Sequence, residues 1–89
     1  SYPMGQSITE AMVYDALKTV IDPELKHNIV DLGFILEMDI VDDYVHLEIQ
    51  LTTPYCPFAE NIVEQIKRAV AGVKGVKRVE VERACMKES

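Results

Sequence analysis

One cysteine of this chain stands where the residues around it could support thiol chemistry. The stretch LTTPYCPFAE, residues 51–60, sets Cys56 between Pro54 and Pro57, where alternating apolar residues give way to a helical pattern. Pro57 suits the first position of a helix, because its missing N–H has no intrahelical partner there. Cys56 is therefore predicted at the N-cap, beside unpaired N–H groups that stabilise a thiolate and lower the pKa of a cysteine.

The alternative is that Cys56 only fills space, because free cysteine is among the most often buried residue types. No histidine lies near it in the sequence, so a thiol hydrolase has little local support. The second cysteine, Cys85, follows the last predicted strand, and we expect it to be incidental. Two cysteines are too few for a disulfide scaffold and match no structural zinc spacing, which favours a reducing, cytoplasmic setting.

Composition indicates an ordinary globular domain. The chain has 89 residues, of which 48% are hydrophobic and 27% are charged, and its net charge is −6. This acidity argues against a nucleic-acid partner, since a phosphate backbone attracts basic proteins. No apolar run approaches the ~20 residues of a membrane span, and no signal peptide pattern appears. Residues 1–6 are expected to be disordered or to derive from an expression vector.

The first half of the chain predicts a helix followed by a strand. Ser7 and Glu10 have the spacing of a capping box at the start of a helix over residues 7–22, which Pro23 should end. The apolar face of this helix is expected to hold Val13, Ala16, Leu17, Val20 and Ile21. Phe34, Leu36, Met38 and Ile40 alternate at strand spacing and should face the core, with Ile35 on the outer face. Asp42-Asp43 is the expected turn after them.

The second half predicts a strand, a helix and a last strand. Val45, Leu47, Ile49 and Leu51 should face the core from a strand over residues 45–52, with His46 on the solvated side. A helix over residues 57–70 carries an apolar stripe of Phe58, Ala59, Ile62, Val63, Ile66, Ala69 and Val70. In the segment 76–84, Val79 and Val81 should point inward and Glu80 and Glu82 outward. The predicted fold is α+β, a single two-layer α-β-β-α-β domain over residues 1–89 with two helices on one face of a three-stranded sheet.

Three ordered motifs carry a resemblance to a known family. They are Asp22-Pro23-Glu24, then Ile29-Val30-Asp31-Leu32-Gly33, then Thr52-Thr53-Pro54-Tyr55-Cys56-Pro57. Together they resemble the iron–sulfur cluster assembly domain family, which includes SufT-like proteins, PaaD-like proteins, a subunit of the eukaryotic cytosolic iron–sulfur targeting complex, and domains preceding the P-loop ATPase of some Mrp-type carriers. The resemblance covers roughly residues 8–84 and implies the same α-β-β-α-β fold.

This chain departs from the family pattern in two places. Many relatives continue past the last strand into a tail that contains Pro and Trp, whereas this chain ends at ACMKES. PaaD-like proteins add a cysteine-rich segment that is absent here. The general cluster-maturation role is therefore favoured over the PaaD role.

The resemblance implies that Cys56 is the reactive residue and a transient cluster ligand. A common cluster takes about four thiolates, so the two cysteines of this chain imply a homodimer or ligands from a partner. Asp22, Glu24 and Asp31 match acidic positions of the family and could ligate iron or contact a partner, with Thr53 as a further supporting residue. Structural roles are weighed equally for the acidic residues: Asp22 would cap backbone groups around Pro23, and Asp31 would stabilise the turn before Gly33. For Thr53, a hydrogen bond at a strand end is favoured over a chemical role.

The function expected from all of this is non-enzymatic. The chain would help to transfer iron–sulfur clusters to recipient apoproteins, with a scaffold or P-loop carrier as its other partner and with no nucleic acid or membrane partner. One alternative is a metal-free adaptor that recruits recipients to a scaffold. Another is a thiol-redox enzyme built around Cys56.

Overall fold

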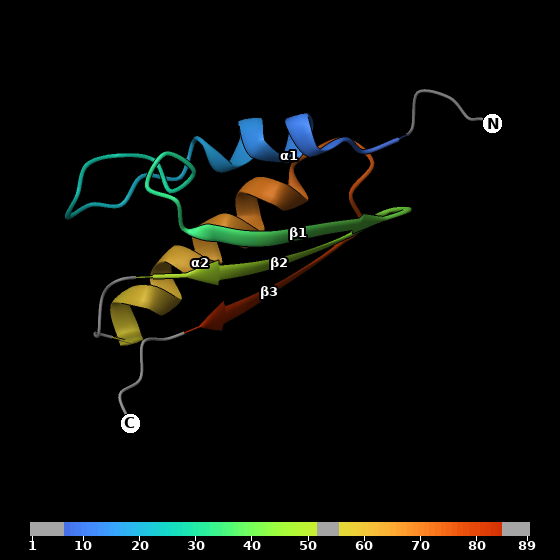
Figure 1. Cartoon of the computed structure of the whole chain (residues 1–89). Coiled ribbons are helices and arrows are strands. Elements are labelled where there is room, and N and C mark those ends of the chain that lie inside the picture. Colours follow the sequence, from blue (N-terminus) through green and yellow to red (C-terminus); the bar gives the residue numbers. More distant parts are fainter. Residues whose placement is uncertain (1–6, 52–55, 85–89) are drawn as a thin grey trace.

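The elements follow one another in the predicted order. The computed structural model describes residues 7–51 and 56–84, with helix α1 at Glu10–Leu17, strand β1 at Ile35–Val41, strand β2 at Tyr44–Gln50, helix α2 at Cys56–Ala71 and strand β3 at Arg78–Ala84. The two helices lie on one side of the sheet (Figure 1). The predicted α+β class is confirmed.

The sheet is mixed, with β2 at its centre. Its strand order is β1-β2-β3; β1 pairs antiparallel with β2, and β2 pairs parallel with β3. A parallel pair needs a crossover connection, which is here the long helix α2 (Figure 1). The described residues contain no helix long and apolar enough to cross a membrane.

The core forms where β2 meets the helices. The predicted inner row of β2 is confirmed, since Val45, Leu47 and Ile49 are 0% exposed and Leu51 is 2% exposed. The helices bury Val13 and Leu17 of α1 and Ala59, Ile62, Ile66 and Val70 of α2 against this row. Each large aliphatic side chain removed from water in this way contributes about 1.5–3 kcal/mol. The other side of the sheet has no helix over it in the described part of the chain (Figure 1).

A bulge at the start of β1 changes which side chains face the core. The predictions that Leu36 faces inward and Ile35 outward were wrong: Leu36 is 48% exposed, whereas Ile35 packs against the core and pairs with Ile49. The register shifts between Ile35 and Glu37. The extra residue of the bulge disturbs the alternation at Ile35 and Leu36 only, and Phe34, Met38 and Ile40 pack in or against the core as predicted.

Helix α1 is shorter than predicted at both ends. Its N-cap is Thr9, whose side chain accepts a hydrogen bond from the Met12 amide at 3.2 Å, so the predicted Ser7–Glu10 capping box was wrong. The helix ends at Leu17, well before Pro23. After Leu17, backbone hydrogen bonds between residues three apart continue to Val20, and the Ile29 amide donates to the Val20 carbonyl at 3.0 Å. This pairing with the next loop replaces further helical turns.

Because α1 ends early, two apolar residues that follow it, Val20 and Ile21, differ in their exposure to solvent. Val20 is buried as predicted, but Ile21 is 46% exposed and forms a β-bridge with Asn28. The prediction that Ile21 belongs to the apolar face was therefore wrong.

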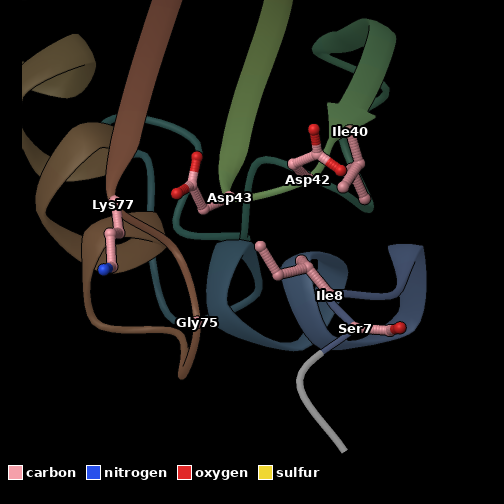
Figure 2. Close-up of a pocket in the computed structure, with 7 residues that line it drawn as sticks. All are labelled: Ser7, Ile8, Ile40, Asp42, Asp43, Gly75 and Lys77. Atoms are coloured by element: carbon pink, nitrogen blue, oxygen red, sulfur yellow. The ribbon is translucent and has the colours of Figure 1, made fainter. Parts of the chain in front are cut away.

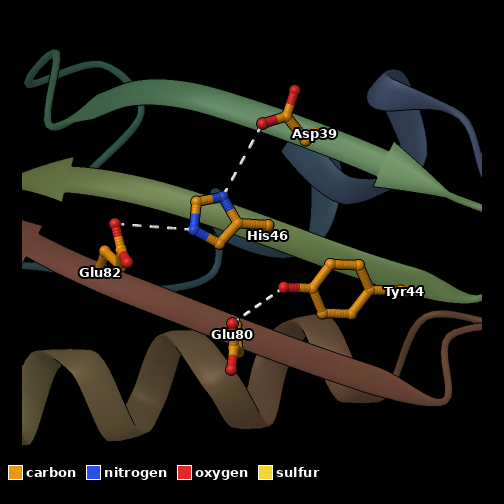
Figure 3. A network of polar contacts seen from close by, with 5 residues as sticks. All are labelled: Asp39, Tyr44, His46, Glu80 and Glu82. Carbon is orange, nitrogen blue, oxygen red and sulfur yellow. Dashed lines mark hydrogen bonds and ion pairs between the residues drawn. The ribbon is translucent and has the colours of Figure 1, made fainter.

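The uncovered face of the sheet carries a polar network (Figure 3). His46 of β2 lies between two carboxylates, with Nδ1 3.8 Å from Asp39 of β1 and Nε2 3.8 Å from Glu82 of β3. The Tyr44 hydroxyl donates a hydrogen bond to Glu80 at 2.8 Å. The network links all three strands and confirms that His46 and the two glutamates face away from the helices.

The Tyr44–Glu80 contact leads to a pH prediction. The hydrogen bond to Glu80, followed by partial burial and the negative charge of that carboxylate, raises the pKa of Tyr44 above 10.0. A raised pKa means that this contribution to stability is complete below the unfolded pKa of about 10 and is lost as pH rises through the folded pKa. We expect Glu80→Gln to lower the pKa of Tyr44, measured by NMR titration of its ring signals. Glu82→Gln is the control and should cause a smaller drop; equal drops would contradict the assignment.

Candidate functional site

One end of the sheet gathers the segments that the motifs singled out. Near this end Ile35 of β1 pairs with Ile49 of β2, and Gln50 pairs with Ala84 of β3. The loop over residues 22–33 leads into β1 there, and the chain leaves β2 there to begin α2 (Figure 1). The fold therefore brings the acidic loop and the start of α2 to the same end of the molecule.

Cys56 is the first residue of α2. The prediction started the helix at about Pro57 with Cys56 as its N-cap, so the two boundaries agree within one residue, the usual uncertainty of a helix end. The side chain of Cys56 lies outside the described part of the structure, as do Thr53 and Cys85. The cap, ligand and supporting roles given to these residues stay predictions.

An ion pair between α2 and β3 marks the same end of the molecule. Glu60, one helical turn after Cys56, lies 4.0 Å from Arg83, the penultimate residue of β3. An ion pair with an exposed member contributes at most about 1 kcal/mol to stability. The contact nevertheless shows that the start of α2 lies close to the end of β3. Sequence reasoning missed this contact, because residues so far apart in the chain give no local pattern.

Asp22 has a structural role in the loop. The residue is 5% exposed, and its Oδ1 accepts hydrogen bonds from the amides of Glu24 at 2.8 Å and Leu25 at 2.9 Å. Its own amide donates to the His27 carbonyl at 2.9 Å. Asp22 thus holds the turn after Pro23, which is the capping role considered in the sequence.

Asp31 belongs to a second turn, closed by Asn28. The Asn28 side chain accepts from the Asp31 amide at 2.9 Å and donates to the Asp31 carboxylate at 3.1 Å. Gly33 ends this turn at a φ of +77°, a conformation that other L-residues rarely adopt. Asp31 is exposed, as are Glu24 and His27, so these charged side chains are presented from a loop with a defined backbone.

The acidic candidate ligands of the described loop do not form a metal centre among themselves. Within the described residues, no three His, Cys, Asp or Glu side chains are grouped so that they could hold a metal ion. Asp22 is occupied by backbone amides, and Asp31 is paired with Asn28. Of the predicted acidic residues, Glu24 and Asp31 are the two that present carboxylates at the surface of the loop.

A hollow at the opposite end of the sheet is shown in Figure 2. This cavity of about 540 Å³ is lined by Ser7, Ile8, Ile40, Asp42, Asp43, Gly75 and Lys77. These residues precede α1, end β1, form the β1–β2 turn, and connect α2 to β3. The cavity is therefore separated from Cys56 by the length of the sheet.

The two loop carboxylates should differ in their effect on stability. Asp22→Ala removes the acceptor of two amides and should lower the free energy of unfolding by about 1–3 kcal/mol. Asp31→Ala, at an exposed position, should lower it by less than about 0.5 kcal/mol. Urea unfolding measures both values. Asp22→Asn is the matched control, because it keeps an acceptor oxygen; an Asp31→Ala loss as large as that of Asp22→Ala would contradict this assignment.

Comparison with known proteins finds relatives in sequence and a solved structure with a similar fold. The chain is 41% identical over 75 residues, covering 83% of it and 71% of the relative, to an Fe-S protein maturation auxiliary factor of Porphyromonas gingivalis. It is 40% identical over 75 residues, covering 84% of it, to an iron-sulfur cluster carrier protein of Synechocystis, of which it spans only 21%. A solved structure of a conserved hypothetical protein from Thermotoga maritima matches with a TM-score of 0.82 and 37% identity, over 92% of this chain and 81% of that one.

The family comparison tests the resemblance directly. The model of the family described as iron-sulfur cluster assembly protein matches residues 10–82. This range falls within the residues 8–84 over which the three motifs predicted the resemblance, and that prediction is confirmed. The chain belongs to the iron–sulfur cluster assembly protein family.

Proposed function

We propose that this chain is a non-enzymatic maturation factor that assists iron–sulfur cluster transfer to recipient apoproteins, with Cys56 as its reactive residue. The observation that carries the proposal is the position of Cys56 as the first residue of α2, at the end of the sheet where the acidic loop also lies. The names of the relatives support the process: one is a maturation auxiliary factor and another a cluster carrier.

The helix start gives a physical reason for reactivity. The first amides of a helix have no intrahelical partners, and together with the helix dipole they favour a negative charge by about 0.3–1 kcal/mol. A cysteine at such a position has a lowered pKa, and the thiolate is the form that binds iron. Among the described side chains of the 16-residue helix α2, those of Ala59, Ile62, Ile66 and Val70 are buried.

The number of thiols implies that the cluster is cargo. Clusters are held by about four thiolates, and the chain has only Cys56 and Cys85. Two copies of Cys56 in a homodimer would supply two of these thiolates and so form a labile site, whereas one Cys56 would be completed by ligands from a scaffold or P-loop carrier. Such a shared site releases its cluster when the partners separate, which suits transfer in the reducing cytoplasm.

The exposed acidic loop supports the alternative of a metal-free adaptor. Glu24, His27 and Asp31 are exposed on turns that Asp22 and Asn28 hold in one conformation. A surface with a defined backbone binds at a smaller entropic cost than a mobile one. In this alternative the loop recruits recipient proteins to an assembly scaffold, and Cys56 binds no iron.

Anaerobic reconstitution with iron and sulfide tests the proposal. Wild type, Cys56→Ser and Cys85→Ser are treated in parallel, and visible absorption and iron content are measured across a sizing column. We expect a wild-type dimer with one cluster per pair of chains, which Cys56→Ser abolishes and the matched control Cys85→Ser retains. Circular dichroism confirms that each variant is folded.

Two outcomes would contradict the proposed role in cluster transfer. If no variant acquires a specific cluster, alone or with a P-loop carrier present, the adaptor is favoured. If Cys56→Ser retains the cluster, the reactive residue has been misassigned. Binding of a recipient apoprotein to Cys56→Ser then separates the functions, because the adaptor requires that binding to survive the substitution.

A further inference from the structure

The strand β3 has one edge with no neighbour in the described part of the chain. Its other edge pairs with β2 along its whole length, from Arg78 opposite Tyr44 to Ala84 opposite Gln50. The strand order ends with β3, which lies at the border of the sheet (Figure 1). Such an edge presents amide and carbonyl groups that can pair with a further extended segment.

A groove with an apolar floor runs beside this edge, on the helix side of the sheet. It has a volume of about 440 Å³ and lies between α2 and β3, lined by Glu60, Val63, Glu64, Lys67, Val81 and Arg83. Val63 and Val81 are half-buried and pack against the core, so they supply the floor. The charged residues around them include both signs, and the groove therefore has no strong preference for a charge.

The opposite face of β3 is acidic. Glu80 and Glu82 project from it, both exposed, and Glu48 of β2 lies directly beside Glu82 in the register. Arg78, at the start of β3, lies over the ring of Tyr44 at 5.3 Å, close to the opposite end of the strand from Glu82. Like charges in neighbouring strands repel, so a strand added next to β3 is favoured if it places cations beside these glutamates.

This charge pattern disfavours a second copy of the chain as the occupant. An antiparallel pairing of β3 with itself over its full length is centred on Val81, and it places Glu80 opposite Glu82 of the second copy. The same repulsion would occur twice, once on each side of the two-fold axis.

We propose that the outer edge of β3, the edge away from β2, binds an extended segment of a partner protein in which apolar residues alternate with Lys or Arg. The segment adds a fourth strand to the sheet. Its apolar side chains enter the groove over Val63 and Val81, and its cations lie beside Glu80 and Glu82. This mode of binding takes its affinity from backbone hydrogen bonds and its selectivity from alternate side chains. The inference goes beyond cluster transfer and does not depend on the chemistry of Cys56.

The proposal has a spatial consequence for the partner. Because β3 ends at the same end of the sheet at which α2 begins, a bound segment leads the partner protein toward the end that holds Cys56.

The test uses fluorescent peptides as long as β3, with binding followed by anisotropy. The first alternates Lys with Val, the second replaces every Lys by Glu, and the third has the Lys and Val residues in two separate blocks. We expect the alternating cationic peptide to bind at least about tenfold more tightly than either control, since a tenfold difference needs only about 1.4 kcal/mol. Protection of β3 amides from hydrogen exchange should accompany binding.

Backbone pairing is tested with two N-methylated forms of the cationic peptide. In one the methyl groups are on every Lys amide, and in the other on every Val amide. Because alternate amides of a strand point to opposite edges, pairing with β3 requires one form to bind and the other to lose binding by at least about tenfold. Equal binding of the two forms would show charge attraction without strand addition and would overturn the proposal.

Two matched protein variants locate the site. Glu82→Lys should weaken binding about tenfold, because it turns an attractive pair into a repulsive one. Glu37→Lys makes the same change of charge on β1, the strand at the other border of the sheet, and should weaken peptide binding less than about twofold. Equal weakening by the two variants, protection of β1 in place of β3, or dimerisation of the free protein through β3 would each overturn the proposal. Cys56→Ser should bind the peptide as wild type does, so failure here and failure of cluster transfer are distinguished.

Discussion

Burial of one face of β2 is the constraint on which the rest of this structure depends. Val45, Leu47, Ile49 and Leu51 are almost fully removed from water, and both helices contribute side chains to the cluster that covers them. β2 also provides the pairing partner for both other strands. Because a one-residue slip would turn this row toward solvent, the burial sets the register of the sheet. The register in turn brings the acidic loop and the first residue of α2 to one end.

The sequence predicted the elements that follow a single period over their whole length. β2 alternates strictly, and α2 repeats its apolar residues at helical spacing, so β2 and the part of α2 from Ala59 onward were assigned the correct inward face. The side chain of Phe58, predicted on the same stripe, lies outside the described part of the structure. β1 and α1 were only partly predicted, for physical reasons that differ. The bulge at Leu36 inserts one residue and reverses the pattern locally. α1 ends early because Val20 and Ile21 pair with residues of the next loop, and this competes with further helix.

The candidate site shows the same division between local and long-range information. The type and position of Asp22, just before a proline, were enough to predict a turn-capping role, because the bonds it makes are to amides two and three residues away. The place of Cys56 at the start of a helix also followed from its neighbours, Pro57 above all. The contacts of Glu60 with Arg83 and of Tyr44 with Glu80 join distant parts of the chain, and no local pattern predicts them.

The mixed pairing of the sheet has a consequence for how the molecule assembles. β1 and β2 are joined by a turn of two residues, Asp42 and Asp43, and hairpins of this kind form in about 1–10 μs. β3 can pair with β2 only after the chain has passed through the whole of α2. Bringing such distant segments together costs conformational entropy before any contact between them stabilises the pair, and this makes the pairing slow. The strand that borders the sheet is therefore expected to join it last. Until it does, one edge of β2 is open, and a newly made chain meets its neighbours while the strand that carries most of its buried core is paired on one side only.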